Sequence, residues 1–157
     1  MIRILVDSGS EYLPKKAQEK GLEVLPIVTN VGGTDYRDGI DLGRDEFFEL
    51  LEETGLFPST SQITPHTFAE TFKQARDAGD EVIALILSSA LSGTYQNACM
   101  AQAMVGGEGI YVIDSLTATY PISILADYAA RLRDEGWEAK RIVEALEELK
   151  GSVKVIA

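Results

Sequence analysis

The sequence predicts an α/β fold in which a mostly parallel sheet is covered by helices on both faces. Aliphatic segments alternate along the chain with segments of helical periodicity. Residues 2–6, 82–87 and 109–113 are apolar at nearly every position, which is typical of parallel strands buried on both faces. The chain has 157 residues, the size of one ordinary domain, so we treat residues 1–157 as a single domain.

The first strand is expected at residues 2–6. A short helix over residues 14–21 follows, because Pro14 lies near its start and Gly21 just past its end.

The next segment, residues 22–31, is rich in β-formers but contains Pro26. A central strand tolerates proline poorly, so we place this strand at an edge of the sheet. Gly32 and Gly33 are a two-residue hairpin signal that leads into residues 34–37.

Helical spacing of apolar residues recurs through the rest of the chain. The segment from Arg44 to Glu53 has this spacing, and Thr64-Pro65 opens a helix with Phe68 and Phe72 on one face. The remaining elements are expected as a strand at 82–87, a helix at 93–104, a strand at 109–113, and helices at 121–134 and 138–149. Residues 153–157 look like the first half of another strand, so we expect the chain to be part of a longer protein.

Charge and composition exclude several classes of function. The net charge of -11 argues against nucleic acid and against anionic membrane surfaces, both of which attract a surplus of Lys and Arg. Nothing approaches the roughly 20 apolar residues of a membrane span, and the short apolar run before Asp7 does not resemble a secretory signal. We therefore expect a cytoplasmic protein without membrane insertion. Cys99, the only cysteine, lies in an apolar stretch that favours a buried thiol.

Three expected strands end in hydroxyl-bearing pairs: Asp7-Ser8, Ser88-Ser89 and Asp114-Ser115. Ser and Asp are also the preferred helix N-caps, so each pair alone is explained by capping. The carboxyl ends of parallel strands nevertheless form the ligand crevice of an open sheet. Together with the segments 59–62 and 92–94, these ends predict a hydroxyl-lined pocket suited to an anion such as carboxylate or phosphate.

Enzyme interpretations have less support. His66 is the only histidine, no Gly-x-Ser-x-Gly elbow accompanies a serine, and there is no P-loop, so we expect neither catalysis nor a cofactor. A phosphocarrier or enzyme that uses His66 remains an alternative, as does an interaction module without ligand. The carboxylates of residues 36–41 favour a salt-bridged turn over a metal site.

Five segments together form a family pattern, and they recur in order over nearly the whole chain. They are Val6-Asp7-Ser8, Tyr36-Arg37-Asp38-Gly39-Ile40-Asp41, Thr60-Ser61-Gln62-Ile63-Thr64-Pro65, Ser88-Ser89-Ala90-Leu91-Ser92-Gly93-Thr94-Tyr95-Gln96 and Val112-Ile113-Asp114-Ser115. With them the chain resembles the amino-terminal domain of the DegV family of bacterial fatty-acid-binding proteins. One departure is Ile63, where the family usually has proline.

The resemblance implies a Rossmann-like three-layer α/β/α domain with an edge hairpin, followed in such proteins by a second lipid-binding domain that this chain lacks. It implies a long-chain fatty acid held between the two domains and presented to a separate ATP-dependent fatty-acid kinase. Carried over onto this sequence, the residues that hold the carboxylate are Thr60, Ser61, Ser92 and, through its backbone, Gly93.

Overall fold

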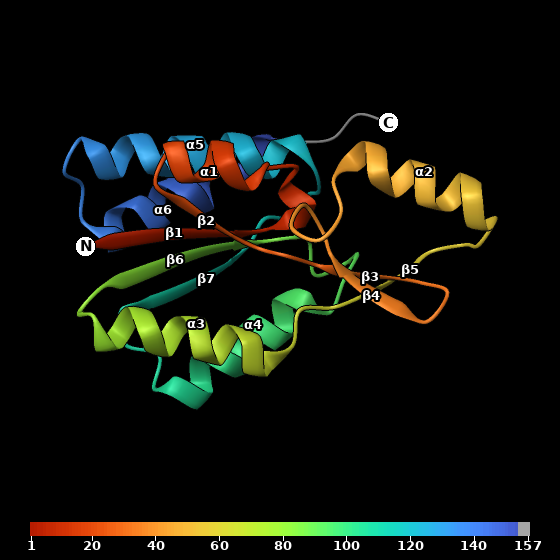
Figure 1. Ribbon diagram of the computed structural model, residues 1–157. Coiled ribbons are helices and arrows are strands. Elements are labelled where there is room, and N and C mark those ends of the chain that lie inside the picture. Colours follow the sequence, from red (N-terminus) through yellow and green to blue (C-terminus); the bar gives the residue numbers. More distant parts are fainter. Residues whose placement is uncertain (154–157) are drawn as a thin grey trace.

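The computed structural model describes residues 1–153, and within them it has the predicted three-layer α/β/α arrangement (Figure 1). Four parallel strands form the central sheet in the order β2-β1-β6-β7. Their bounds are β1 Ile2–Asp7, β2 Leu22–Leu25, β6 Glu81–Ile86 and β7 Ile110–Asp114. One face is covered by α1 (Pro14–Glu19), α5 (Tyr120–Asp134) and α6 (Ala139–Leu149), and the other by α3 (Pro65–Asp77) and α4 (Thr94–Val105).

The central strands are buried on both faces, as their continuous apolar sequences predicted. In β1, Ile4 and Val6 pack into the core beneath α5 and α6, whereas Leu5 packs into the opposite core with Phe68 and Phe72 of α3. Successive side chains of a strand point to opposite faces, so one apolar strand serves both cores.

A second, smaller sheet is antiparallel and has the order β4-β3-β5. Its strands are β3 (Val28–Val31), β4 (Thr34–Arg37) and β5 (Ser59–Ser61). The predicted hairpin joins β3 to β4, and both of its glycines have the positive φ that a tight two-residue turn demands, 61° at Gly32 and 88° at Gly33.

The single edge strand expected at residues 22–31 is only partly correct. Its first part, β2, does lie at an edge of the parallel sheet. The chain leaves that sheet at Pro26, which has no N–H to donate to a ladder, and it continues as β3 in the middle of the second sheet.

The remaining elements are α2 (Arg44–Thr54) and two 3-10 turns, Ser8–Ser10 and Lys150–Ser152. Figure 1 shows α2 beside the second sheet and away from the central layers, and it buries none of its residues. Apart from Val153, the strand expected at residues 153–157 lies outside the described residues. Within residues 1–153 no helix combines the length and the apolarity that crossing a membrane requires.

Candidate functional site

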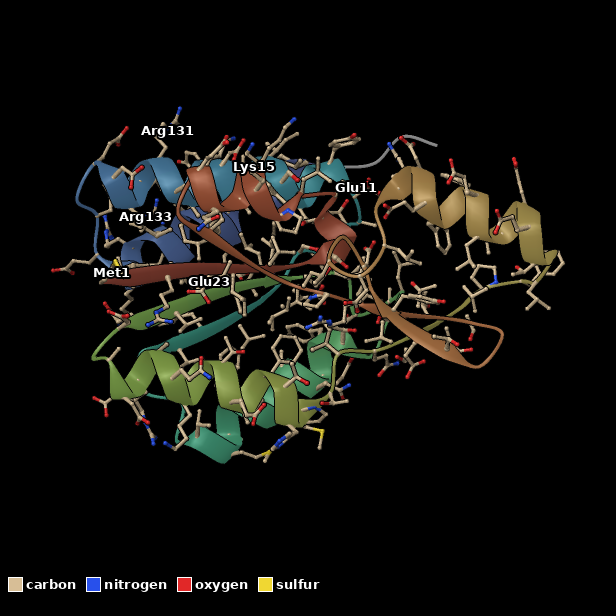
Figure 2. All side chains as sticks on the ribbon, in the orientation of Figure 1. Met1, Glu11, Lys15, Glu23, Arg131 and Arg133 are labelled. Atoms are coloured by element: carbon tan, nitrogen blue, oxygen red, sulfur yellow. The ribbon has the colours of Figure 1, made fainter. Side chains whose placement is uncertain are left out.

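The carboxyl ends of β1, β6 and β7 lie at one edge of the sheet, the edge that faces α2 and the second sheet (Figure 1). This arrangement brings together the three hydroxyl-bearing pairs, as we expected for strands that run parallel. Figure 2 shows Glu11 at this edge, whereas Met1 and Glu23 lie toward the opposite end of the strands. In open α/β sheets, the carboxyl edge is where ligands bind.

Asp7 is buried at the end of β1, and its carboxylate joins two strand ends. One oxygen accepts the Gly9 N–H at 2.9 Å and the other accepts the Leu87 N–H, just beyond β6, at 2.7 Å. Burial disfavours the charged form and raises the pKa of Asp7 to about 6, although the two N–H groups oppose that rise. Asp7 therefore fixes the backbone of this edge, and each of its oxygens already accepts a backbone N–H.

Other side chains of these pairs also bond to backbone groups in the loops at this edge. Asp114 accepts the N–H groups of Ser89 and Leu116 at 3.1 and 3.0 Å. The Ser8 hydroxyl accepts the Ile27 N–H at 3.0 Å, and the Ser115 hydroxyl donates to the Thr117 carbonyl at 3.2 Å. Capping and loop fixing, rather than ligand binding, account for these groups.

Backbone strain gathers at the same edge. Within residues 1–153, three residues other than glycine have positive φ: Glu11 at 62°, Leu116 at 58° and Thr119 at 60°. All three lie in loops that follow β1 or β7. A β-branched residue rarely adopts this conformation, and such outliers concentrate at binding sites. At Thr119 the loop is held by a bond from its N–H to the Gly9 carbonyl at 2.8 Å.

Thr60 and Ser61 are exposed residues of β5, a strand that the sequence did not predict because its residues are polar throughout. In the register of the second sheet Thr60 lies opposite Thr29, which also lies opposite Tyr36. Directly opposed residues of antiparallel strands point to one face of the sheet, so Thr60 shares a face with Thr29 and Tyr36.

Ser92 and Gly93 immediately precede α4. The Ser92 hydroxyl accepts the Thr94 N–H at 3.2 Å and shares a hydrogen bond with the Thr94 hydroxyl at 2.9 Å. This places two hydroxyl groups at the start of a 12-residue helix, whose N–H groups carry partial positive charge.

The structure brings these two segments together. The Gln62 amide, next to Ser61, lies over Gly93, since a Cβ atom on Gly93 would be 2.6 Å from its nitrogen and its oxygen. Asn97 of α4 donates to Gln62 Oε1 at 3.2 Å and to the Ile63 carbonyl at 2.9 Å. The sequence patterns pointed to hydroxyl groups here and did not point to Gln62 or Asn97. One indication of Gln62 was present in the sequence, because the Thr-Ser-Gln motif includes its amide side chain.

A cleft of about 890 Å³ lies between α1, α2, the second sheet and the start of α5. Its walls include the aromatic residues Tyr12, Tyr36, Phe47, Phe48 and Tyr120, together with several charged side chains. Thr29 and Tyr36 line it, so the face of the second sheet that carries Thr60 is the face toward the cleft. Thr60, Ser61, Ser92 and Gly93 are not themselves among its lining residues within the described chain.

The structure also places the other residues that the sequence singled out as possible sites. The His66 side chain is 80% exposed and lies 3.4 Å from Glu70, as expected for a surface residue. Arg37 and Asp41 form the expected salt-bridged turn, with both guanidinium contacts shorter than 3.0 Å. Residues 1–153 contain no cluster of three or more His, Cys, Asp or Glu side chains placed to hold a metal. Cys99 lies on α4 and is partly rather than fully buried, so the expected burial of this residue is only partly met.

Comparison with known proteins identifies relatives over the whole chain. A family model described as an uncharacterised protein of the DegV family matches residues 1–157. A DegV domain-containing protein from Caldanaerobacter subterraneus is 40% identical over 147 residues, which are 94% of this chain and 52% of the relative. One from Clostridium acetobutylicum is 37% identical over 152 residues, 97% of this chain and 52% of the relative. The chain thus spans about half the length of the curated relatives it matches.

Solved structures of the same kind superpose closely. A fatty-acid-binding DegV family protein from Thermus thermophilus has a TM-score of 0.84 at 31% identity, covering 95% of this chain and 53% of its own. DegV from Bacillus subtilis, described as a fatty acid binding protein, has a TM-score of 0.88 at 28% identity, with coverages of 96% and 54%. A stearic acid-binding protein from Eubacterium ventriosum has a TM-score of 0.84 at 27% identity, with coverages of 94% and 52%.

Proposed function

This chain belongs to the DegV family, and we propose that it forms the head-group half of a cytoplasmic fatty-acid carrier. In this proposal Thr60, Ser61, Ser92 and the backbone of Gly93 hold the acyl carboxylate. One observation carries the proposal: two hydroxyl-bearing segments far apart in sequence meet at the start of α4, through the Gln62–Gly93 contact. The solved relatives described as fatty-acid-binding proteins support the choice of ligand.

The chemistry of this corner suits a carboxylate. Hydroxyl groups and the N–H groups at a helix start donate hydrogen bonds to an anion, and the helix dipole favours negative charge there. Each hydrogen bond to a charged group contributes about 1.5–3 kcal/mol. Burial of roughly a dozen methylenes at about 0.8 kcal/mol each contributes on the order of 10 kcal/mol before the costs of binding. The tail therefore sets most of the affinity, and the hydroxyls set the orientation.

We further propose that a second lipid-binding domain completes the site, because the relatives are about twice as long as the stretch they share with this chain. The cleft beside Thr29 and Tyr36 then receives part of the tail, and the second domain covers the rest. A carrier needs no acid–base pair, so the proposal assigns no catalytic step to this protein. Its partner, implied by the family resemblance, is a separate ATP-dependent fatty-acid kinase that phosphorylates the bound acid.

The test is mass spectrometry of an organic extract from the purified whole protein, that is, the complete product of the gene that encodes this chain. We expect a long-chain fatty acid in near-stoichiometric amount. A protein that carries no lipid and takes up none from a fatty-acid mixture would point to an interaction module. A mass increase that depends on a phosphate donor and disappears in His66→Ala would point to a phosphocarrier.

A further inference from the structure

A neighbouring side chain, and not the backbone conformation, limits what residue can stand at position 93. Its φ is -75°, which any residue adopts without strain. A Cβ atom at this position would however lie 2.6 Å from both terminal atoms of Gln62, closer than real Cβ atoms come to other heavy atoms. The space that a side chain of residue 93 would need is therefore occupied by the Gln62 amide.

The Gln62 amide is held in place from α4. Asn97 donates from one nitrogen to Gln62 Oε1 at 3.2 Å and to the Ile63 carbonyl at 2.9 Å. Asn97 lies one helical turn after Gly93, and its own N–H donates to the Gly93 carbonyl at 3.0 Å. Ile63 is 4% exposed and packs in the core with α3. The anchor of the exposed Gln62 amide is thus tied to α4 by hydrogen bonds and to α3 by the packing of Ile63.

This anchor joins two segments that no sheet ladder joins. Thr60 and Ser61 lie on β5, which pairs with β3 in the second sheet, whereas Ser92 and Gly93 lie between β6 and α4. A carboxylate that accepts hydrogen bonds from both segments needs their spacing held to roughly 0.5 Å. The contacts through Gln62 and Asn97 supply that constraint.

We propose that Gln62 is the positioning residue of the head-group site. Asn97 anchors the Gln62 amide, and the lack of a side chain at Gly93 leaves the space that this amide occupies. This inference rests on the proposed function and adds a residue that acts through the spacing of the hydroxyl groups. It predicts that displacing Gln62 weakens recognition of the carboxylate and leaves recognition of the tail unchanged.

Gly93→Ala in the whole protein is the sharpest test, because its backbone is permitted and its Cβ must push the Gln62 amide away. We expect affinity for a long-chain fatty acid to fall about tenfold. Affinity for the alcohol of the same chain length, which has the same tail and no carboxylate, should change less than about twofold. Gln74→Ala, an exposed glutamine on α3, serves as the matched control and should leave both affinities unchanged.

A double-mutant cycle separates positioning from a direct need for a bare backbone at residue 93. If Gly93 serves only to make room for Gln62, then Gly93→Ala, Gln62→Ala and the double variant all show the same loss of about tenfold. Asn97→Ala should match them. Gln62→Asn keeps the amide but is one methylene shorter, so it should not restore affinity.

Several results would overturn the inference. A double variant whose loss is the product of the two single losses would show that residues 62 and 93 act independently. Equal losses for the acid and the alcohol would show a general structural role. Normal acid affinity in Gln62→Ala, alongside a loss in Ser92→Ala, would leave the proposed function standing and remove Gln62 from it. A wild-type protein that binds neither ligand, or prefers the alcohol, would instead refute the proposed function.

Discussion

Replacing Asp7 with asparagine probes the buried carboxylate that joins the ends of β1 and β6. The side chain is fully buried, and it accepts one N–H from Gly9 and one from Leu87. Asparagine has nearly the same shape, carries no charge and keeps one of the two acceptors. The substitution therefore removes the cost of burying a charge. It also loses one hydrogen bond, because the amide N–H₂ group faces a backbone N–H and both groups are donors.

The pH dependence follows from the raised pKa of Asp7. The carboxyl group titrates near 3.8 when unfolded and at about 6 in the folded protein, so between these values the folded state binds more protons. The folded protein is accordingly favoured below the unfolded pKa, and this contribution is lost as the pH rises through 6. The displacement corresponds to a cost of about 3 kcal/mol at pH 7 and roughly 1.5 kcal/mol at pH 5.

Equilibrium denaturation of wild type and Asp7→Asn at pH 7, 6 and 5 measures this cost. The lost hydrogen bond costs about 1–3 kcal/mol at every pH, so the informative quantity is the change in the difference between the two proteins. We expect wild type to gain about 1.5 kcal/mol over the variant from pH 7 to pH 5. Asp41 and Asp80, whose pKa values are lowered by Arg37 and by the N-terminus with Arg3, stay ionised in this range and cancel. A constant difference, or a gain by the variant, would refute the reasoning.

Three further predictions concern the ligand and the core. Ser92→Ala and Thr60→Ala in the whole protein should weaken fatty-acid binding about ten- to hundredfold, as loss of a hydrogen bond to a charged group predicts. If these residues only cap or fix loops, melting temperature will fall and affinity will not; His66→Ala is the control and should bind normally. Calorimetry should show tight binding by the whole protein and weak or no binding by residues 1–157 alone, and equal affinities would contradict the two-domain site. Phe72→Ala, which empties a fully buried position, should lower the free energy of unfolding by about 3–5 kcal/mol in chemical denaturation.

The elements that the sequence predicted best are those whose apolar residues reflect burial in the core. β1 and β6 are apolar at every core position, so their place in the middle of a covered sheet follows from composition alone. β5 escaped prediction because Ser59–Ser61 has no apolar alternation, and its pairing with β3 is decided by tertiary structure. The division of residues 22–31 into β2 and β3 at Pro26 was not predicted for a related reason. Proline marks a break in a hydrogen-bonded ladder, but it does not indicate which sheet the next strand joins.

The candidate site divides in the same way. Parallel strands dictated that the three hydroxyl-bearing pairs meet at one edge, but the pattern did not show that both oxygens of Asp7 and one oxygen of Asp114 would already accept backbone N–H groups. Ser and Asp serve as caps and as ligands with identical chemistry, so their role depends on which donors the fold places beside them. Gln62 was missed because its contribution lies in a contact with Gly93, 31 positions away in the printed numbering.

The position of α2 supplies a physical reason to expect that the lipid site is shared with a second domain. Its Phe47, Leu50 and Leu51 have the spacing of a packed helix face, yet all three are only half-buried, and Phe48 is 56% exposed. An 11-residue helix gains most of its stability from packing an apolar face rather than from its own propensity. Phe47 and Phe48 also line the cleft, so whatever covers this face of α2 also closes the cleft over its contents. In the proposed carrier, the domain that covers α2 would therefore also enclose the acyl tail, and this is why we expect tail affinity to depend on the second domain even though the hydroxyl groups proposed for the carboxylate lie in residues 1–157.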